Sequence, residues 1–245
     1  QISVLTATGL AALSSTELQG WSTTQLAALT SQQFVGLAAT EIQDFSETQL
    51  GGFTSTQLRG ITATQLSALS STYLQALDVA QLSTQQVAGL DATAAGNLSS
   101  TQVQSLSAGQ VGALSAGALS ALGSTDLQAW STTQLGAVTA TQLGGLTTTE
   151  ISDFSDTQLG LLTSTQLRGF TVSQLNAMDT AQLTVLTAAS LSTAQIGGLT
   201  STALDRLTTT QIGTLDASQF RAIAPAALDS LATDVFAGLT TTQAA

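Results

Sequence analysis

The sequence predicts an all-α solenoid built from short capped helical turns, one for each eight-residue repeat. Three observations predict this fold class. The chain matches itself in steps of eight residues, each step carries a helix-start signal, and apolar residues flank each start. From residue 46 the repeats read SETQLGGF, TSTQLRGI, TATQLSAL and SSTYLQAL. We label the eight positions a to h: a is usually Ser or Thr, d is usually Gln or Glu, e and h are apolar, and g is usually small.

The octads form a single continuous repeat array, which we expect to span residues 1–245. They run over residues 6–77, 83–186 and 192–239, with five-residue units at 78–82 and 187–191. The starts of the two five-residue units lie 109 residues apart, and the same separation relates Trp21 to Trp130. The five-residue units therefore belong to a longer repeat. We expect the solenoid to curl into a superhelix whose phase is reset at these units.

Each octad boundary carries the pattern of a capping box. The hydroxyl at position a is expected to accept a hydrogen bond from the backbone N–H of d, while the side chain of d bonds the backbone N–H of a. The apolar h of one octad and the apolar e of the next occupy the hydrophobic staple positions. Residues 53–58, FTSTQL, are one complete example. The sequence thus predicts one short α or 3₁₀ turn per octad.

Substitutions at these positions follow the same geometry. Aspartate, another strong N-cap residue, replaces Ser or Thr at Asp78, Asp91, Asp179 and Asp216. Pro225 falls at position b, the first helical position, where proline is best tolerated. The exceptions at position a are Ala38, Ala224, Ala232 and Gly123. The small residues at g predict either close packing or a corner that needs unusual backbone angles.

Two alternative folds do not fit the repeat. Eight residues of one continuous α-helix would turn about 800°, so the apolar e and h residues would drift by about 80° per octad and never share a face. A conventional strand fails because the apolar residues do not alternate with a period of two. Repeated restarts of a short helix are the interpretation that remains.

The composition excludes most catalytic chemistry, and we expect no enzyme. The chain has no His, Lys or Cys, so it lacks the commonest general base, the Schiff-base amine and the thiolate nucleophile. Its cations are Arg59, Arg168, Arg206 and Arg221. Four arginines among 15 carboxylates cannot track a phosphate backbone, so we expect no nucleic-acid partner. No apolar run approaches the roughly 18 residues of a membrane span, so we expect no membrane insertion.

One acidic pattern is the only candidate metal site. A trio with spacing i, i+3, i+6 occurs twice, at Glu41, Asp44 and Glu47 and again at Glu150, Asp153 and Asp156. Ca²⁺ would need about six oxygen ligands, which backbone carbonyls or a neighbouring coil would have to complete. The alternative, a solvated acidic corner that marks each longer repeat, is the interpretation we favour. We expect no other cofactor.

Hydroxyl and aromatic side chains suggest a second class of function. Many octads carry Thr-x-Thr, as at residues 62–64, and regular threonine arrays resemble the ice-binding face of some β-solenoid antifreeze proteins. A surface glycan is a further candidate ligand for the Ser and Thr residues. Trp21 and Trp130 occupy position h, where packing in the core or a groove is favoured over a carbohydrate platform.

Tandem LTxxQLxx units that are rich in Thr, Gln, Ala and Leu resemble repeat tracts of very large secreted proteins of Gram-negative bacteria. Those proteins are adhesin-like or form surface structures, and some leave the cell by type I secretion. The resemblance covers nearly the whole chain and implies an extracellular or cell-surface location. The glycine-aspartate nonapeptide block typical of calcium-dependent secretion signals is missing here.

We therefore predict a non-enzymatic extracellular structural repeat, as a filament, sheath or adhesin-stalk segment. The array stops within an octad pattern at residues 240–243, TTTQ, so coils of one copy are expected to stack on another copy. The alternative is a binding module that uses its Ser and Thr array for ice or polysaccharide.

Overall fold

The computed structural model describes residues 2–229 and 231, and these residues form an all-α repeat. The octad at 232–239 and the residues that follow it lie outside the described part, and so does Ala232. Within the described residues, every octad contains one α-helix of four to six residues. Each five-residue unit contains one 3₁₀ turn, η2 (Val79–Gln81) or η3 (Ala188–Ser190), and a further turn, η1, spans Ile2–Val4. The predicted fold class is confirmed.

The helices follow one another at octad spacing along both compact units into which the chain divides, residues 1–126 and 127–245. In the first unit they are α1 (Ala7–Ala11), α2 (Ser15–Gln19), α3 (Thr23–Ala27), α4 (Ser31–Val35), α5 (Ala39–Ile42), α6 (Glu47–Gly51), α7 (Ser55–Leu58), α8 (Ala63–Ala68), α9 (Ser71–Ala76), α10 (Thr84–Ala88), α11 (Ala92–Gly96), α12 (Ser100–Ser105), α13 (Ala108–Ala113) and α14 (Ala116–Ser120). Helix α15 (Ser124–Gln128) spans the division between the units.

In the second unit they are α16 (Thr132–Ala137), α17 (Ala140–Gly145), α18 (Thr148–Ser152), α19 (Asp156–Gly160), α20 (Ser164–Leu167), α21 (Val172–Ala177), α22 (Thr180–Val185), α23 (Thr193–Gly197), α24 (Ser201–Asp205), α25 (Thr209–Gly213), α26 (Ala217–Ala222) and α27 (Pro225–Leu228). None of the described helices is long and apolar enough to cross a membrane.

The helices begin where the capping boxes predict. At α8 the backbone N–H of Gln65 donates to Thr62 Oγ1 at 3.2 Å, and the backbone N–H of Thr62 donates to Gln65 Oε1 at 2.6 Å. Thr62 itself is extended, with φ −73° and ψ 157°, so the chain turns into the helix at this residue. Because the same box recurs at most octads, the helix restarts instead of continuing.

Residues at position a that lack a hydroxyl show what the cap contributes. Ala38 provides no acceptor for the helix, yet its backbone N–H still donates to the Glu41 carboxylate at 2.7 Å. Ala224 also makes no side-chain cap, and Pro225 follows it at the first helical position. Half of the box, or proline in the first turn, is enough to start a helix here.

The cap at Ala38 can be completed, and this gives a test of the cap energy. Ala38→Ser is expected to raise the free energy of unfolding by about 1 kcal/mol, because its hydroxyl can accept from the free N–H groups of the first turn. Thr62→Ala is expected to lower it by a similar amount. Urea unfolding followed by helical circular dichroism measures both. Equal effects of the same sign would contradict the capping account.

The apolar residues at e and h form the core. Leu58 and Ile61, the e and h residues of one octad, are both fully buried. The largest aromatic cluster joins Phe34 at e to Phe45 and Phe53 at h, with Phe53 edge-on to each of the others at ring-centroid distances of 5.0 and 5.4 Å. The apolar residues at positions e and h therefore pack against residues at positions e and h of other octads.

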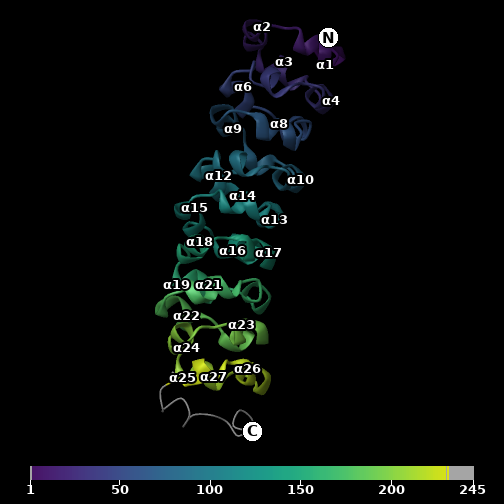
Figure 1. Ribbon diagram of the computed structural model, residues 1–245. Coiled ribbons are helices and arrows are strands. Elements are labelled where there is room, and N and C mark those ends of the chain that lie inside the picture. Colours follow the sequence, from purple (N-terminus) through teal and green to yellow (C-terminus); the bar gives the residue numbers. More distant parts are fainter. Residues whose placement is uncertain (1, 230, 232–245) are drawn as a thin grey trace. The chain divides into compact units, whose positions relative to one another are not determined.

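Each coil of the solenoid holds between three and four units. Within each compact unit, helices pack against those three units further along, such as α1 against α4 and α6 against α9 in the first, and α19 against α22 and α23 against α26 in the second (Figure 1). Hydrogen bonds from position d reach four units back: Gln57 Nε2 donates to the carbonyls of Leu26 at 2.7 Å and Leu29 at 3.2 Å. The sequence alone did not provide this coil period.

The five-residue units are octads without positions b, c and d. Val79 and Leu82 are buried as the e and h residues of ordinary octads are. Their carbonyls accept from Gln110 Nε2 at 2.8 and 2.9 Å, as e and h carbonyls do elsewhere. A five-residue unit therefore preserves the core and the accepting carbonyls of a coil while shortening that coil by three residues.

Small residues at position g allow helices of successive coils to approach closely. A Cβ atom on Gly60 would lie 2.1 Å from the backbone oxygen of Ser31, at the contact between α7 and α4. No described residue, glycine included, has a positive φ. Of the two reasons predicted for small residues at g, close packing is confirmed, and the need for unusual backbone angles is wrong.

Candidate functional site

The capping box assigns a bond to only one end of each glutamine at position d, the amide oxygen. Fifteen of them are buried, and they are the only buried polar or charged side chains among the described residues: Gln33, Gln49, Gln57, Gln65, Gln86, Gln102, Gln110, Gln134, Gln142, Gln158, Gln166, Gln174, Gln182, Gln195 and Gln219. Their Oε1 atoms accept from the N–H of position a, as predicted. Within each compact unit, Nε2 atoms of these glutamines donate to carbonyls of the preceding coil, and we call each such bond an amide rung. The rungs come from Gln33, Gln49, Gln57, Gln65, Gln86, Gln102, Gln110, Gln158, Gln166, Gln174, Gln182, Gln195 and Gln219.

An amide rung supplies a donor to an h carbonyl that follows a short helix, and a second donor to an e carbonyl that already accepts from the h N–H, as Leu58 does from Ile61 at 2.9 Å. A helix of five residues leaves most of its C-terminal carbonyls free, and a buried free carbonyl is costly. Gln86 Nε2 donates to the carbonyls of Leu58 at 2.7 Å and Ile61 at 2.6 Å. One neutral side chain thus caps its own helix and closes the end of another.

Position f makes a second set of bonds between coils, which run in the opposite direction along the chain. Gln19 Nε2 donates to the carbonyl of Asp44 at 3.1 Å, and its counterpart 109 residues later, Gln128, donates to Asp153 at 2.7 Å. Arg168 Nε likewise donates to the Ser190 carbonyl at 3.2 Å. This arginine therefore acts as a structural donor, as the amides do.

Arg206 donates a hydrogen bond to the preceding coil in an octad that has no glutamine at position d. Its octad has Ala203 at position d, which has no donor to offer to the preceding coil. Arg206, at position g of the same octad, donates through Nη1 to the carbonyl of Met178, an h carbonyl of the kind that a Gln at d would bond. The repeat therefore keeps the donor even where it loses the glutamine.

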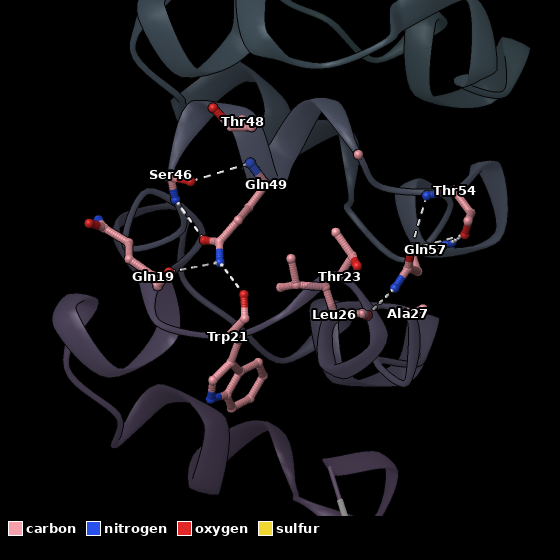
Figure 2. A pocket seen from close by; sticks show the side chains of 11 residues that line it. Gln19, Trp21, Thr23, Leu26, Ala27, Ser46, Thr48, Gln49, Thr54 and Gln57 are labelled. Atoms are coloured by element: carbon pink, nitrogen blue, oxygen red, sulfur yellow. Dashed lines mark hydrogen bonds between the residues drawn. The ribbon is translucent and has the colours of Figure 1, made fainter.

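A cavity lies between two coils of the first unit, where α2 and α3 face α6 and α7. It measures about 340 Å³. Its lining residues are Gln19, Trp21, Thr23, Leu26, Ala27, Ser46, Thr48, Gln49, Gly52, Thr54 and Gln57. None of these side chains is charged or offers a general base. Figure 2 shows the Trp21 carbonyl facing Gln49, whereas the indole extends to the other side, away from Gln49.

The two tryptophans offer little to a ligand. Trp130 is buried, with 5% of its surface exposed, and its indole N–H has no hydrogen-bond partner. Trp21 is half-buried. At the position equivalent to Gly52, which borders the cavity, the second copy of the longer repeat has Leu161. These features are those of packing residues between coils.

No protein-family model matches this sequence, and no curated protein matches it. The candidate sites are therefore judged on their geometry and chemistry.

The acidic trios do not converge on one point. Among the described residues, no group of three or more Asp or Glu side chains is arranged to hold a metal ion. Glu41 and Glu150 instead accept from the backbone N–H groups of Ala38 and Thr147, at 2.7 and 2.6 Å, as helix caps. Asp44 and Asp153 are half-exposed, and Glu47 and Asp156 are exposed. The trios are therefore divided between helix caps and carboxylates that are partly or fully exposed.

Glu17 is the carboxylate on which a cap has a clear electrostatic effect. The backbone N–H and the hydroxyl of Ser14 both donate to it at 2.8 Å, and these bonds hold the pKa of Glu17 below its usual value. A lowered folded-state pKa means that this contribution to stability is present above the unfolded pKa and is lost as pH falls.

Position c carries exposed threonines in both compact units. These eighteen residues are Thr8, Thr16, Thr24, Thr40, Thr48, Thr56, Thr64, Thr72, Thr93, Thr101, Thr125, Thr133, Thr141, Thr149, Thr157, Thr165, Thr202 and Thr210. All are exposed, and in the part of the chain that the structure describes their hydroxyls make no hydrogen bond with the protein. Most hydroxyls at position a, in contrast, are engaged in caps, and Ser70 and Thr187 are exceptions. Position c is thus the outward hydroxyl surface of the repeat.

Proposed function

We propose that this chain is a non-enzymatic structural array, an extracellular spacer or filament segment that associates with copies of itself. The observation that supports the proposal most is the amide rung. It recurs at octad after octad and serves only to join one coil to the next. Because each coil presents the same kind of surface to its neighbour, the array can be lengthened by repetition without any new type of contact.

The character of the surface agrees with a structural role. The described residues bury only uncharged side chains, and the exposed ones are mostly Ser, Thr, Gln, Ala and Gly. A net charge of −11 keeps the chain soluble without a concentrated field that would steer a charged ligand. Hydroxyls at position a are held by glutamine oxygens, as Ser83 Oγ is at 2.9 Å from Gln86 Oε1.

Self-association can be tested on the whole purified chain. We expect light scattering to show growth of the mean particle mass with concentration, and electron microscopy to show regular fibres or end-to-end stacks. Gly60→Ala, which disturbs the packing of coils, should reduce both. A chain that remains a monodisperse monomer at every concentration would overturn the self-association.

A second candidate function is binding to a neutral hydroxylated surface, ice or polysaccharide, and the exposed threonines at position c favour it. Replacing Thr56, Thr64 and Thr72 by Lys should then abolish thermal hysteresis or retention on immobilised neutral glycans. Ser71→Lys, on the neighbouring exposed position b, is the matched control. Binding by the monomer that the threonine variant loses and the serine variant keeps would favour this function over the structural one.

A further inference from the structure

Contacts between octads extend only to the neighbouring coils. The side-chain hydrogen bonds that join octads connect residues between 22 and 31 positions apart. Helices pack against those about three units along the chain in either direction. There is no cysteine, so no disulfide ties distant coils together. Each coil is consequently held by the coil before it and the coil after it, and by nothing else within its compact unit.

The bonds that hold the coils are unequal along the first unit. Three consecutive octads between residues 46 and 69 contribute Gln49, Gln57 and Gln65, and each amide donates to carbonyls of the preceding coil. The Phe34, Phe45 and Phe53 cluster packs in the same stretch. Later octads have Ala94 or Ala118 at position d and so provide no amide there.

Tension between the ends of the chain would load these contacts one coil at a time. A coil that detaches breaks its own rungs and exposes its own e and h residues, while the coils on either side keep theirs. Three to four octads pulled from coil to extended chain lengthen it by about 10 nm. Because the hydrogen bonds between coils span no more than 31 residues, the coil can re-form without closing a longer loop when tension falls.

We propose that the array is an extensible element whose coils detach one after another under tension and re-form on release. This inference rests on the proposed structural function, to which it adds elasticity. Coils with Ala at position d open at lower force than those that contain Gln49, Gln57 and Gln65. The chain then lengthens in steps and protects what it connects from a sudden load.

Optical-tweezers measurements on the whole chain, held by its two ends, test the inference. We expect a series of steps, each releasing about 10 nm of contour length, and recovery of the same steps after relaxation. In the variant Gln49→Ala/Gln57→Ala/Gln65→Ala the highest-force steps should move to lower force. Gln25→Ala, which removes an exposed glutamine with no rung, should leave the pattern unchanged.

Two outcomes would overturn the inference: release of a whole compact unit in one event, or failure to refold after relaxation. Either one, found together with regular fibres in the electron microscope, would leave the structural function standing and remove only the elasticity. Stepwise extension of a chain that never self-associates would keep the elasticity and remove the self-association. The two proposals therefore fail separately.

Discussion

Gln57→Ala is expected to lower the free energy of unfolding by about 2–4 kcal/mol. The side chain is 4% exposed, and its Nε2 donates to the carbonyls of Leu26 and Leu29 at 2.7 and 3.2 Å. Alanine would leave the Leu29 carbonyl buried without a donor, at about 1–3 kcal/mol, whereas the Leu26 carbonyl would keep its bond from the Leu29 N–H at 3.0 Å. It would also lose the bond from the Thr54 N–H to Oε1. Urea unfolding monitored by circular dichroism measures the loss.

Gln25→Ala is the matched control for this prediction. Gln25 also sits at position d, and its Oε1 accepts from the Ser22 N–H at 2.8 Å, but the residue is exposed and makes no rung. Its replacement should cost only the cap, about 1 kcal/mol. Equal losses for the two variants would show that the rung adds nothing to the cap.

Gln57→Glu separates the two halves of the amide in one residue. A carboxylate keeps the cap, as Glu41 does, but it faces two carbonyl oxygens without a proton to donate. Burial against these oxygens raises the folded-state pKa above the unfolded value of about 4.3. The variant should therefore be nearly as unstable as Gln57→Ala at neutral pH, and should recover stability as pH falls through the folded pKa. A stability independent of pH would contradict this.

Gly60→Ala is expected to destabilise the chain by about 3 kcal/mol. The new Cβ would lie 2.1 Å from the backbone oxygen of Ser31 and 2.7 Å from its Cα, and these backbone atoms can move only if α4 shifts. Overpacking of this kind typically costs about 1–3 kcal/mol and sometimes more. Gly169, its counterpart in the second copy, would meet the Ala140 oxygen at 2.3 Å and should respond alike.

Gly117→Ala is the control for the glycine prediction. Gly117 lies inside α14, and a Cβ there would meet nothing within 4 Å. Alanine is the better helix former, so this change should stabilise the chain by about 0.5–1 kcal/mol. Thermal unfolding of Gly117→Ala and Gly60→Ala measures the two changes in stability. A loss of stability in Gly117→Ala comparable to that in Gly60→Ala would remove close packing as the explanation.

Much of the fold could be predicted because its signals are local. Thr62 and Gln65 lie three positions apart, so a capping box is visible in the sequence without knowledge of the coil. The apolar residues on each side of a helix start are equally local, and they form the core as expected. Helix starts and the buried apolar residues follow from these patterns, whereas the choice between an α and a 3₁₀ turn did not.

The coil period could not be predicted, because the residues that determine it are far apart in the sequence. The capping box accounts for the bond that Oε1 of a glutamine such as Gln57 accepts, but it assigns no bond to Nε2. Because a glutamate caps equally well, the capping pattern could not predict what Nε2 does. One signal was present: Gln occurs at position d far more often than Glu. A preference for the amide over the carboxylate indicates that a donor is needed.

The candidate sites were predictable to a smaller extent. The two acidic trios could be read from the sequence, but spacing alone does not tell whether carboxylates point toward one another. Position c was interpreted together with position a as Thr-x-Thr. The first threonine was predicted to cap a helix, as Thr54 does, and the structure adds that the second, such as Thr56, is exposed.

A designed disulfide tests the central claim, the return of the coil after three to four units. A Cβ on Gly160 would lie 3.7 Å from Cβ of Val185, a separation that suits a disulfide, and the chain has no cysteine of its own. In one continuous helix the same residues would be about 38 Å apart. We predict rapid oxidation of Gly160→Cys/Val185→Cys and none of Gly160→Cys/Ala177→Cys, which is out of register. Free thiols in the first pair, or equal oxidation of both, would contradict the coil described here.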